Sequence, residues 1–285
     1  MDWPKIKTIL IGMLIITNLI LGFAYIKEQN QYELDNENNL SDVIALYKNK
    51  NIDVSQIALE FPKSTLSANV ELETFNVALI GKILGDSYTV QSDSFLTETH
   101  TLFFDDTQLL YYDNNHSSRV KQDSVSSLSQ FRQTSDEEER LKKMTLAKTY
   151  LEAIDYPLFY DAYEVSTLGN YTLISFYKSF NGYRFEESKT MIWLYNDEII
   201  GLKGENILKN TITQGTKYDI ISVDKVLYSI LPDIEAGDRI VEMTLIYKLN
   251  DESLLVSDLI MGEALPYYKI VLKSGQQFHV NAIQK

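Results

Sequence analysis

The longest uncharged and mainly apolar run of the chain lies between Thr8 and Ile26, close to its N-terminus. These nineteen residues carry no charge. As a helix they extend about 28 Å, close to the hydrocarbon thickness of a bilayer, about 30 Å. Lys5 and Lys7 precede the run, whereas acidic residues dominate after Lys27. The pattern predicts a membrane-spanning helix with a cytoplasmic N-terminus and an extracellular body.

The same run has a second interpretation, as a signal peptide that is removed. Gly22-Phe23-Ala24 has the small-x-small pattern that a signal peptidase recognises. The apolar run is longer than a typical signal core and continues through Tyr25 and Ile26. We therefore expect residues 1–27 to remain as cytoplasmic tip and anchor, and cleavage after Ala24 stays open.

One face of the predicted helix carries residues in alternating steps of four and three, namely Thr8, Gly12, Ile15, Leu19, Gly22 and Ile26. Asn18 lies about 40° from Gly22 on a helical wheel. Small residues and an amide are what lipid-embedded helices use to pack against a partner. We take Thr8, Gly12, Asn18 and Gly22 as a candidate interaction face. The alternative is a generic anchor that tolerates these residues.

Beyond the anchor, the pattern becomes that of a soluble body. Residues 28–39 are polar and acidic and indicate a tether. A helix capped by Ser41 follows, with Val43, Ile44 and Tyr47 inward. Residues 71–86 have apolar positions 72, 75, 79, 80 and 83, typical of an amphipathic helix that stops at Gly85.

Alternation of period two then predicts strands at residues 87–93, 99–104 and 108–113, the last two joined by a hairpin at residues 105–107. Part of the polar segment 113–135 indicates a domain junction. A capping box of Ser135 and Glu138 begins a helix that Asp155-Tyr156-Pro157 ends.

Most of the remaining chain has strand patterns, namely residues 163–169, 171–180, 183–188, 190–196, 198–204, 239–249, 266–273 and 276–283. Asn181-Gly182 and Ser274-Gly275 are hairpin turns between neighbouring strands. A helix capped by Ser222 interrupts the series, and its apolar face consists of Val223, Val226, Leu227 and Ile230.

Short turns between successive strands favour antiparallel sheets, so we expect an α+β fold with helices packed on one face. The segments divide into an N-terminal α+β subdomain at residues 40–120 and a C-terminal one at residues 135–285.

The charge of the chain excludes some partners. Its formal net charge is −14, and the three charged residues before position 27 sum to +1, which leaves −15 on the rest. Such a surface repels phosphate backbones and anionic lipid headgroups. The absence of cysteine excludes disulfides and thiol chemistry.

No catalytic or metal-binding pattern emerges. His100, His116 and His279 have no metal-site spacing, and no nucleophile elbow or phosphate-binding loop is present. Asp105-Asp106 suits a turn, and Glu137–Glu139 suits the N-terminus of a helix. We therefore expect no catalytic residue, no cofactor and no metal. In Tyr111-Tyr112 and Tyr267-Tyr268, one ring of each pair suits the core, and the other suits either a protein interface or the solvent face of an ordinary amphipathic strand.

Particular stretches resemble a known family. The opening MDWPKIKTILIGMLIITNLIL is similar to that of YycI-type regulatory proteins. The segments ISVDKVLYSIL, EMTLIYKL and ALPYYKIVLKSGQQFHVNAIQK are similar to that family's last domain, and the final hairpin with VNA is similar to PepSY-like modules.

The resemblance implies a non-catalytic, single-pass accessory protein of the WalK/YycG sensor histidine kinase, which governs cell-wall metabolism. It also implies a YycH-like sister protein as partner, and contacts through membrane helices. The sign of the regulation stays open. Two alternatives remain, namely an anchored extracellular ligand-binding module and a cell-wall enzyme with an unrecognised site.

Overall fold

The computed structural model describes residues 11, 13–22, 39–55, 57, 59–121, 130–250 and 261–284. The chain forms two compact units, Met1–Ser55 with Ser222–Asp238, and Gln56–Ile221 with Arg239–Lys285. This grouping differs from the predicted subdomains at residues 40–120 and 135–285, whose division stays a prediction.

In the first unit, residue 11 and residues 13–22 are helical and exposed. No helix among the described residues combines the length and the apolar character needed to cross a membrane. The predicted span at residues 8–26 lies partly outside the described residues, as does the tether up to residue 38. The span therefore stays a prediction.

The remainder of the first unit joins two helices that are distant in the sequence. Residues 39–49 are helical, with Val43 and Tyr47 buried. The predicted cap at Ser41 is wrong, because residues 39 and 40 already belong to the helix. The second helix, α6, covers Val223–Ile230 and is followed by the 3₁₀ turn η2, Leu231–Asp233. Its predicted apolar face is confirmed, since all four residues are buried.

Ser222 occupies the N-cap position of α6, as predicted, with extended backbone angles of −65° and 150°. Its side chain accepts no capping hydrogen bond, and its buried hydroxyl has no partner among the described residues. The sequence therefore predicted the position at which the helix begins and not the hydrogen bond.

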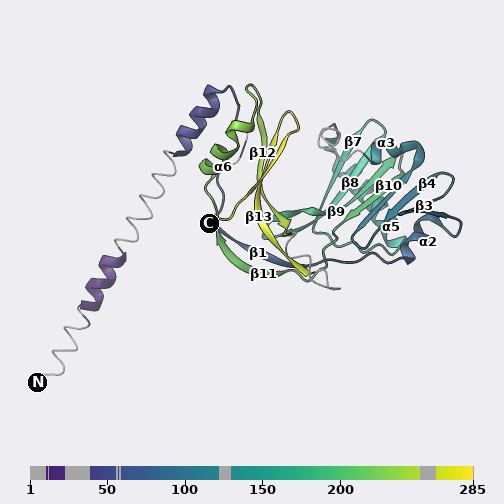
Figure 1. The fold of residues 1–285 in the computed structure, drawn as a ribbon, viewed down its shortest axis with the longest axis horizontal. Coiled ribbons are helices and arrows are strands. Elements are labelled where there is room, and N and C mark those ends of the chain that lie inside the picture. Colours follow the sequence, from purple (N-terminus) through teal and green to yellow (C-terminus); the bar gives the residue numbers. More distant parts are fainter. Residues whose placement is uncertain are drawn as a thin grey trace, which may run out of the picture. The chain divides into compact units, whose positions relative to one another are not determined.

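The second unit is built on a large, mostly antiparallel sheet (Figure 1). Its strands are β1 (Ser64–Glu71), β2 (Thr89–Gln91), β3 (Ser94–Leu96), β4 (His100–Phe104), β5 (Gln108–Asp113), β6 (Arg132–Gln133), β7 (Ala162–Leu168), β8 (Tyr171–Phe180), β9 (Tyr183–Tyr195), β10 (Glu198–Glu205), β11 (Thr213–Asp219), β12 (Ile240–Leu249), β13 (Met261–Leu272) and β14 (Gln277–Asn281).

The strand order is β11-β1-β13-β12-β9-β10-β5-β4-β3-β2, with β14 beside β13, and with β8, β7 and β6 continuing from β9. Strand β9 is the link between the two ends of this sheet. Its later residues pair with β8 and β10, whereas Phe185 lies beside Tyr247 of β12 in a parallel contact. The predicted α+β class is confirmed, with a mixed sheet.

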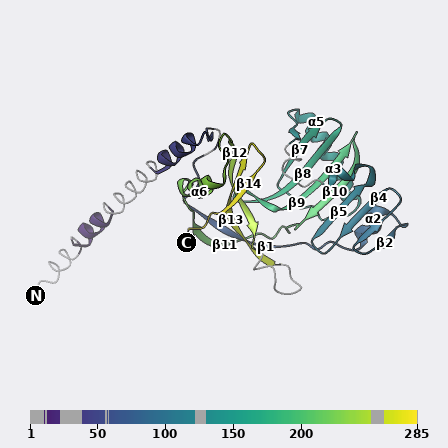
Figure 2. The same cartoon turned by 45° about the horizontal axis from the view of Figure 1, so that its top comes forward.

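Helices cover both faces of the sheet, so the expectation that they pack on one face is wrong. Helices α2 (Ala78–Leu84) and α5 (Glu137–Ala153) pack on one side, near β4 and against β7 and β8 (Figure 2). Leu79, Leu151 and Tyr111 share the core on that face. The short helix α3 (Ser117–Val120) covers part of the other face, preceded by the 3₁₀ turn η1 (Asn114–His116).

Four strands, namely β1, β3, β6 and β11, lie outside the predicted strand segments. Strand β1 runs between β11 and β13 in the sheet, and neither β1 nor β11 was predicted. The hydrogen bonding of β1 also shortens the helix expected at residues 71–86. Leu72 forms a bridge with Leu208, and Glu73 N donates to Ile207 O at 2.7 Å. Only Ala78–Leu84 remain helical, and Gly85 ends them at φ 78°, as predicted.

The remaining differences are local. The cap of α5 is Asp136 rather than Ser135, because the Asp136 carboxylate accepts from the backbone N–H of Glu138 and Glu139. The two strands predicted at residues 183–188 and 190–196 form the single strand β9. The three predicted hairpins are confirmed, and Gly182 and Gly275 adopt φ values of 82° and 91° at their turns.

Candidate functional site

Part of the sheet face around β4, β5 and β10 carries a row of side chains that points to one side. Phe103 of β4 pairs with Leu110 of β5, and Leu110 pairs with Lys203 of β10. Directly opposed residues of antiparallel strands project to the same face. Two residues further along, Glu205 lies between Gln108 and Lys189 on that face.

One end of this face is closed by α3. Gly201 of β10 pairs with Tyr112 and Trp193, and the fully buried Val120 of α3 packs over it. A Cβ atom on Gly201 would lie 2.7 Å from a methyl carbon of Val120. Glycine at this position therefore allows α3 to approach the sheet. The ring of Phe103 lies 6.2 Å from that of Tyr112, between centroids, and Phe103 stays 39% exposed.

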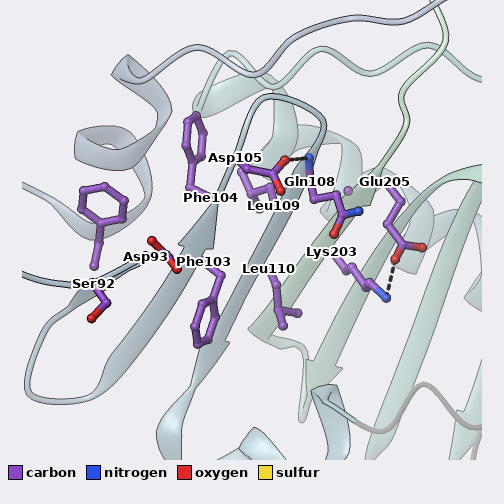
Figure 3. Close-up of a pocket in the computed structure, with 12 residues that line it drawn as sticks. Ser92, Asp93, Phe103, Phe104, Asp105, Gln108, Leu109, Leu110, Lys203 and Glu205 are labelled. Atoms are coloured by element: carbon purple, nitrogen blue, oxygen red, sulfur yellow. Dashed lines mark hydrogen bonds and ion pairs between the residues drawn. The ribbon is translucent and has the colours of Figure 1, made fainter. Parts of the chain in front are cut away.

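A cavity of about 700 Å³ opens at the uncovered part of the face (Figure 3). Such a volume falls within the range of small-molecule sites, about 300–1,000 Å³. The cavity reaches from the β2–β3 turn to the last residues of β10. Its lining includes Asp93, Phe103, Asp105, Leu110, Lys203 and Glu205.

The β10 end of the cavity is an ion-paired cluster. Lys203 Nζ lies 2.6 Å from Glu205 Oε1, and Lys189 Nζ lies 3.7 Å from Glu205 Oε2. The side chain of Lys203 is only 12% exposed. The ammonium group is therefore directed to Glu205 rather than to solvent.

The opposite end carries two carboxylates in different situations. Asp105 Oδ1 accepts hydrogen bonds from the backbone N–H groups of Thr107 and Gln108, at 2.8 and 2.7 Å, and so shapes the β4–β5 turn. Asp93 lies in the β2–β3 turn and is exposed. No described residue gives its carboxylate an ion pair or a hydrogen bond. Asp93 is therefore available to a ligand in a way that Asp105 is not.

A second charged cluster lies where β9 approaches β13. Lys269 Nζ lies 2.6 Å from Glu186 Oε1, and Arg184 Nε lies 3.6 Å from Glu186 Oε2. Burial by itself raises the pKa of Glu186, but Lys269 and then Arg184 outweigh it, so the pKa lies below its ordinary value. Every charge in this set is paired, which suits a cluster that fixes the two strands together.

One of the two tyrosine pairs, Tyr111-Tyr112, is buried more completely than expected. Tyr111 and Tyr112 point to opposite faces, yet both are buried, because the sheet is covered on both sides there. Burial, with a smaller contribution from Asp113, raises the pKa of Tyr111 to about 12. The hypothesis of an interface ring is wrong for this pair. Tyr268 is core and donates to Ile221 O at 2.9 Å, whereas Tyr267 is half-buried.

Two of the three histidines lie against aromatic rings. His100 stacks on Tyr111 with ring centroids 5.4 Å apart, and His116 lies 4.7 Å from Tyr195. His279 is an exposed residue of β14. Within the described ranges, no group of three or more His, Cys, Asp or Glu side chains is placed to hold a metal ion.

Of the predicted transmembrane interaction face, Asn18 and Gly22 are described, and Thr8 and Gly12 lie outside the described residues. Asn18 and Gly22 belong to one helical segment, one turn apart, and both are exposed. A Cβ on Gly22 would meet no atom within 4 Å. The structure does not bring either residue to a partner, so this face stays a prediction.

No sequence pattern indicated that the cavity residues form a site. Asp93, Phe103 and Lys203 are far apart along the chain, and none belongs to a motif. The hairpin at residues 105–107 was recognisable and fixes Phe103 opposite Leu110. The pairing of β5 with β10, which brings in Lys203, left no local signal.

No family model matches the sequence, and no curated protein matches it. Among solved structures, the chain is similar to an uncharacterized protein from Eubacterium rectale, with a TM-score of 0.50 and 10% identity over 76% of this chain and 80% of that one. At this identity the likeness is one of fold alone.

Two further solved structures are more distant. YycH from Bacillus subtilis has a TM-score of 0.43 and 14% identity, over 76% of this chain and 52% of that one. The C-terminal domain of YpeB from Bacillus megaterium has a TM-score of 0.32 and 11% identity, over 74% of this chain and 95% of that one. Both scores lie below 0.5, so these two likenesses carry no weight for function.

Proposed function

We propose that this protein is a non-catalytic, membrane-anchored regulator of a WalK/YycG-type sensor histidine kinase that controls cell-wall metabolism. The N-terminus is cytoplasmic, the body is extracellular, and a YycH-like protein is a second partner. The proposal extends to a PepSY-like C-terminal subdomain. Support comes from the resemblance of the opening residues and of the C-terminal segments to YycI-type proteins.

The observation that carries the proposal is the exposure of the apolar helix near the N-terminus. The side chains of Met13, Leu14, Ile20 and Leu21 are each at least 61% exposed in the isolated chain. Burying a side chain of this size is worth about 1.5–3 kcal/mol relative to exposure in water. A continuous surface of this kind needs lipid or a partner helix to cover it.

Charge restricts where the other contacts form. The body carries the −15 that remains after the first 26 residues, which disfavours association with anionic headgroups. Regulation through the anchor therefore involves helix contacts within the bilayer and protein contacts outside it. Asn18 supplies a polar group and Gly22 a close-approach position on the same side of the helix.

Such a protein needs no chemistry of its own to regulate a kinase. A protein that binds one state of the kinase better than the other shifts the equilibrium between them by its difference in affinity. The sign of the effect depends on which state is preferred.

Membrane co-purification with the kinase tests the proposal. We expect the full chain to fractionate with membranes and to recover the kinase, and Asn18→Leu with Gly22→Leu to lower that recovery without loss of membrane association. The matched control is Ile16→Leu with Ile20→Leu, about 160° from Asn18 on the helix. Full regulation by a body without the helix would overturn the membrane-contact mechanism.

A second candidate function is an anchored extracellular ligand-binding module, which the cavity over Phe103 favours. This reading predicts a bound small molecule and no kinase recovery. A cell-wall enzyme is the remaining alternative. Release of soluble fragments from purified cell wall by the full chain would favour the enzyme over both other functions.

A further inference from the structure

We propose that the cavity beside Phe103 binds an organic cation carried on an apolar body, with Asp93 as the charge partner and Phe103 with Leu110 as the apolar floor. The cation is either a free amine or a lysine or arginine side chain of a polypeptide. This site is independent of the anchor and goes beyond the regulatory function proposed above.

Two side chains form the apolar floor of the cavity. Phe103 and Leu110 oppose each other across β4 and β5 and project into the open part of the face (Figure 3). Their neighbours in sequence, Phe104 and Leu109, also line part of the cavity, but they pack with the core on the other face. The 39% exposure of Phe103 therefore follows from its place in the row and leaves part of a phenyl ring accessible to a ligand.

Charge selects the ligand. The cavity lining has three carboxylates, on Asp93, Asp105 and Glu205, and one ammonium, on Lys203, a formal balance of −2. Glu205 binds Lys203, and Asp105 is engaged in its turn, so Asp93 is the carboxylate open to a new partner. The acidic body adds a long-range attraction for cations and repels anions.

An aromatic ring next to an open carboxylate discriminates further. The face of a phenyl ring attracts a cation, and its area also covers apolar groups. A neutral apolar molecule gains only the second interaction, and a carboxylic acid is repelled by Asp93. The combination therefore favours an amine attached to an apolar or aromatic group.

The test uses the full chain in a nonionic maltoside detergent, with tyramine as probe and 4-hydroxyphenylacetate as its anionic counterpart of similar shape. We expect tyramine to bind and the acid to bind at least about fivefold more weakly, with tyramine affinity falling at high salt. Equal binding of amine and acid, or binding of neither, would overturn the proposal.

Variants locate the site. Asp93→Asn and Phe103→Ala should each weaken tyramine binding about two- to fivefold, the range of one exposed ion pair or cation–π contact. Asp86→Asn is the matched control, an exposed carboxylate of the same region outside the lining. Asp93 is exposed, so its variant keeps the fold. Equal weakening by Asp86→Asn and Asp93→Asn would reduce the effect to general charge and refute the site.

A second arm distinguishes the two sources of the cation. Acetyl-Phe-Lys-amide and acetyl-Phe-Glu-amide are compared with tyramine. Tighter binding of the lysine peptide than of tyramine assigns the site to a polypeptide, and tighter binding of tyramine assigns it to a free amine. Kinase recovery by Asp93→Asn is measured in parallel. A loss of ligand binding at the cavity can then be distinguished from a loss of the proposed regulatory function.

Discussion

The hydroxyl group of Tyr47 donates a 2.8 Å hydrogen bond to the backbone oxygen of Leu227, which lies 180 residues later in the chain. The side chain of Tyr47 is fully buried. Within the first unit, this bond connects the helix at residues 39–49 with α6. The burial also raises the pKa of Tyr47, so the hydroxyl remains protonated at neutral pH.

Tyr47→Phe removes this bond, whereas the Leu227 carbonyl keeps the hydrogen bond that it accepts from the backbone N–H of Leu231. We expect the free energy of unfolding to fall by about 0.5–1.5 kcal/mol, the usual net contribution of one hydrogen bond. Urea unfolding of the full chain in detergent measures it. Tyr228→Phe, at a 63% exposed tyrosine of the same helix α6, is the control and should change little.

Gly204 lies where β10 meets the core. A Cβ atom there would overlap the Tyr156 hydroxyl and lie 2.7 Å from the Phe75 ring. Gly204→Ala should therefore lower the unfolding free energy by about 1–3 kcal/mol through overpacking. Gly81→Ala in α2 meets no atom within 4 Å and should stabilise the helix slightly. Thermal unfolding that ranks the two variants alike would contradict this packing.

The ion pair of Glu186 with Lys269 should be sensitive to substitution. Glu186→Gln leaves the Lys269 ammonium, 7% exposed, without its partner. We expect a loss of about 3–5 kcal/mol in unfolding free energy at neutral pH. Replacing both residues, as Glu186→Gln with Lys269→Met, should recover much of it. Glu152→Gln, in an exposed pair with Lys148, should have no measurable effect.

The same pair predicts a pH dependence. The pKa of Glu186 is lower in the folded chain than its ordinary value of 4.5, so the unfolded chain takes up the proton first on acidification. The contribution of Glu186 is present above about pH 4.5 and is lost as pH falls through the folded pKa. Denaturant midpoints measured from pH 7 to pH 3 should include this loss of stability in the wild type. The loss should be absent in Glu186→Gln.

The N-terminus of α5 has two neighbouring candidate caps, Ser135 and Asp136, which substitutions can distinguish. Asp136→Ala should cost about 1 kcal/mol of unfolding free energy, because its carboxylate accepts from the backbone N–H groups of Glu138 and Glu139. Ser135→Ala should cost little. Equal losses of unfolding free energy in the two variants, measured by chemical denaturation, would contradict the assignment of the cap to Asp136.

Local chemistry made several elements predictable. The turn at Asn181-Gly182 needs left-handed backbone, which glycine and asparagine adopt readily. The apolar spacing of α6 was visible because burial of one helical face repeats every three to four residues. In both cases the interacting residues are neighbours in sequence, so the pattern contains the information.

Strand β1 shows the limit of that information. Its sequence, Ser-Thr-Leu-Ser-Ala-Asn-Val-Glu, has few large apolar residues. Ser67 and Ala68 are nevertheless fully buried, since β11 and β13 flank the strand on its two sides. The strand depends on hydrogen bonds to residues almost 150 and 200 positions away, and local propensity does not record such partners.

The sequence by itself determined the apolar N-terminal run, the acidic body, the α+β class and the turns between adjacent strands. Only the tertiary structure decided that helices cover both faces, that Tyr111 and Tyr112 are both buried, and that Phe103, Leu110 and Lys203 form one row. Strand register places side chains from distant segments on a common face. The cavity and its charge balance are consequences of that register.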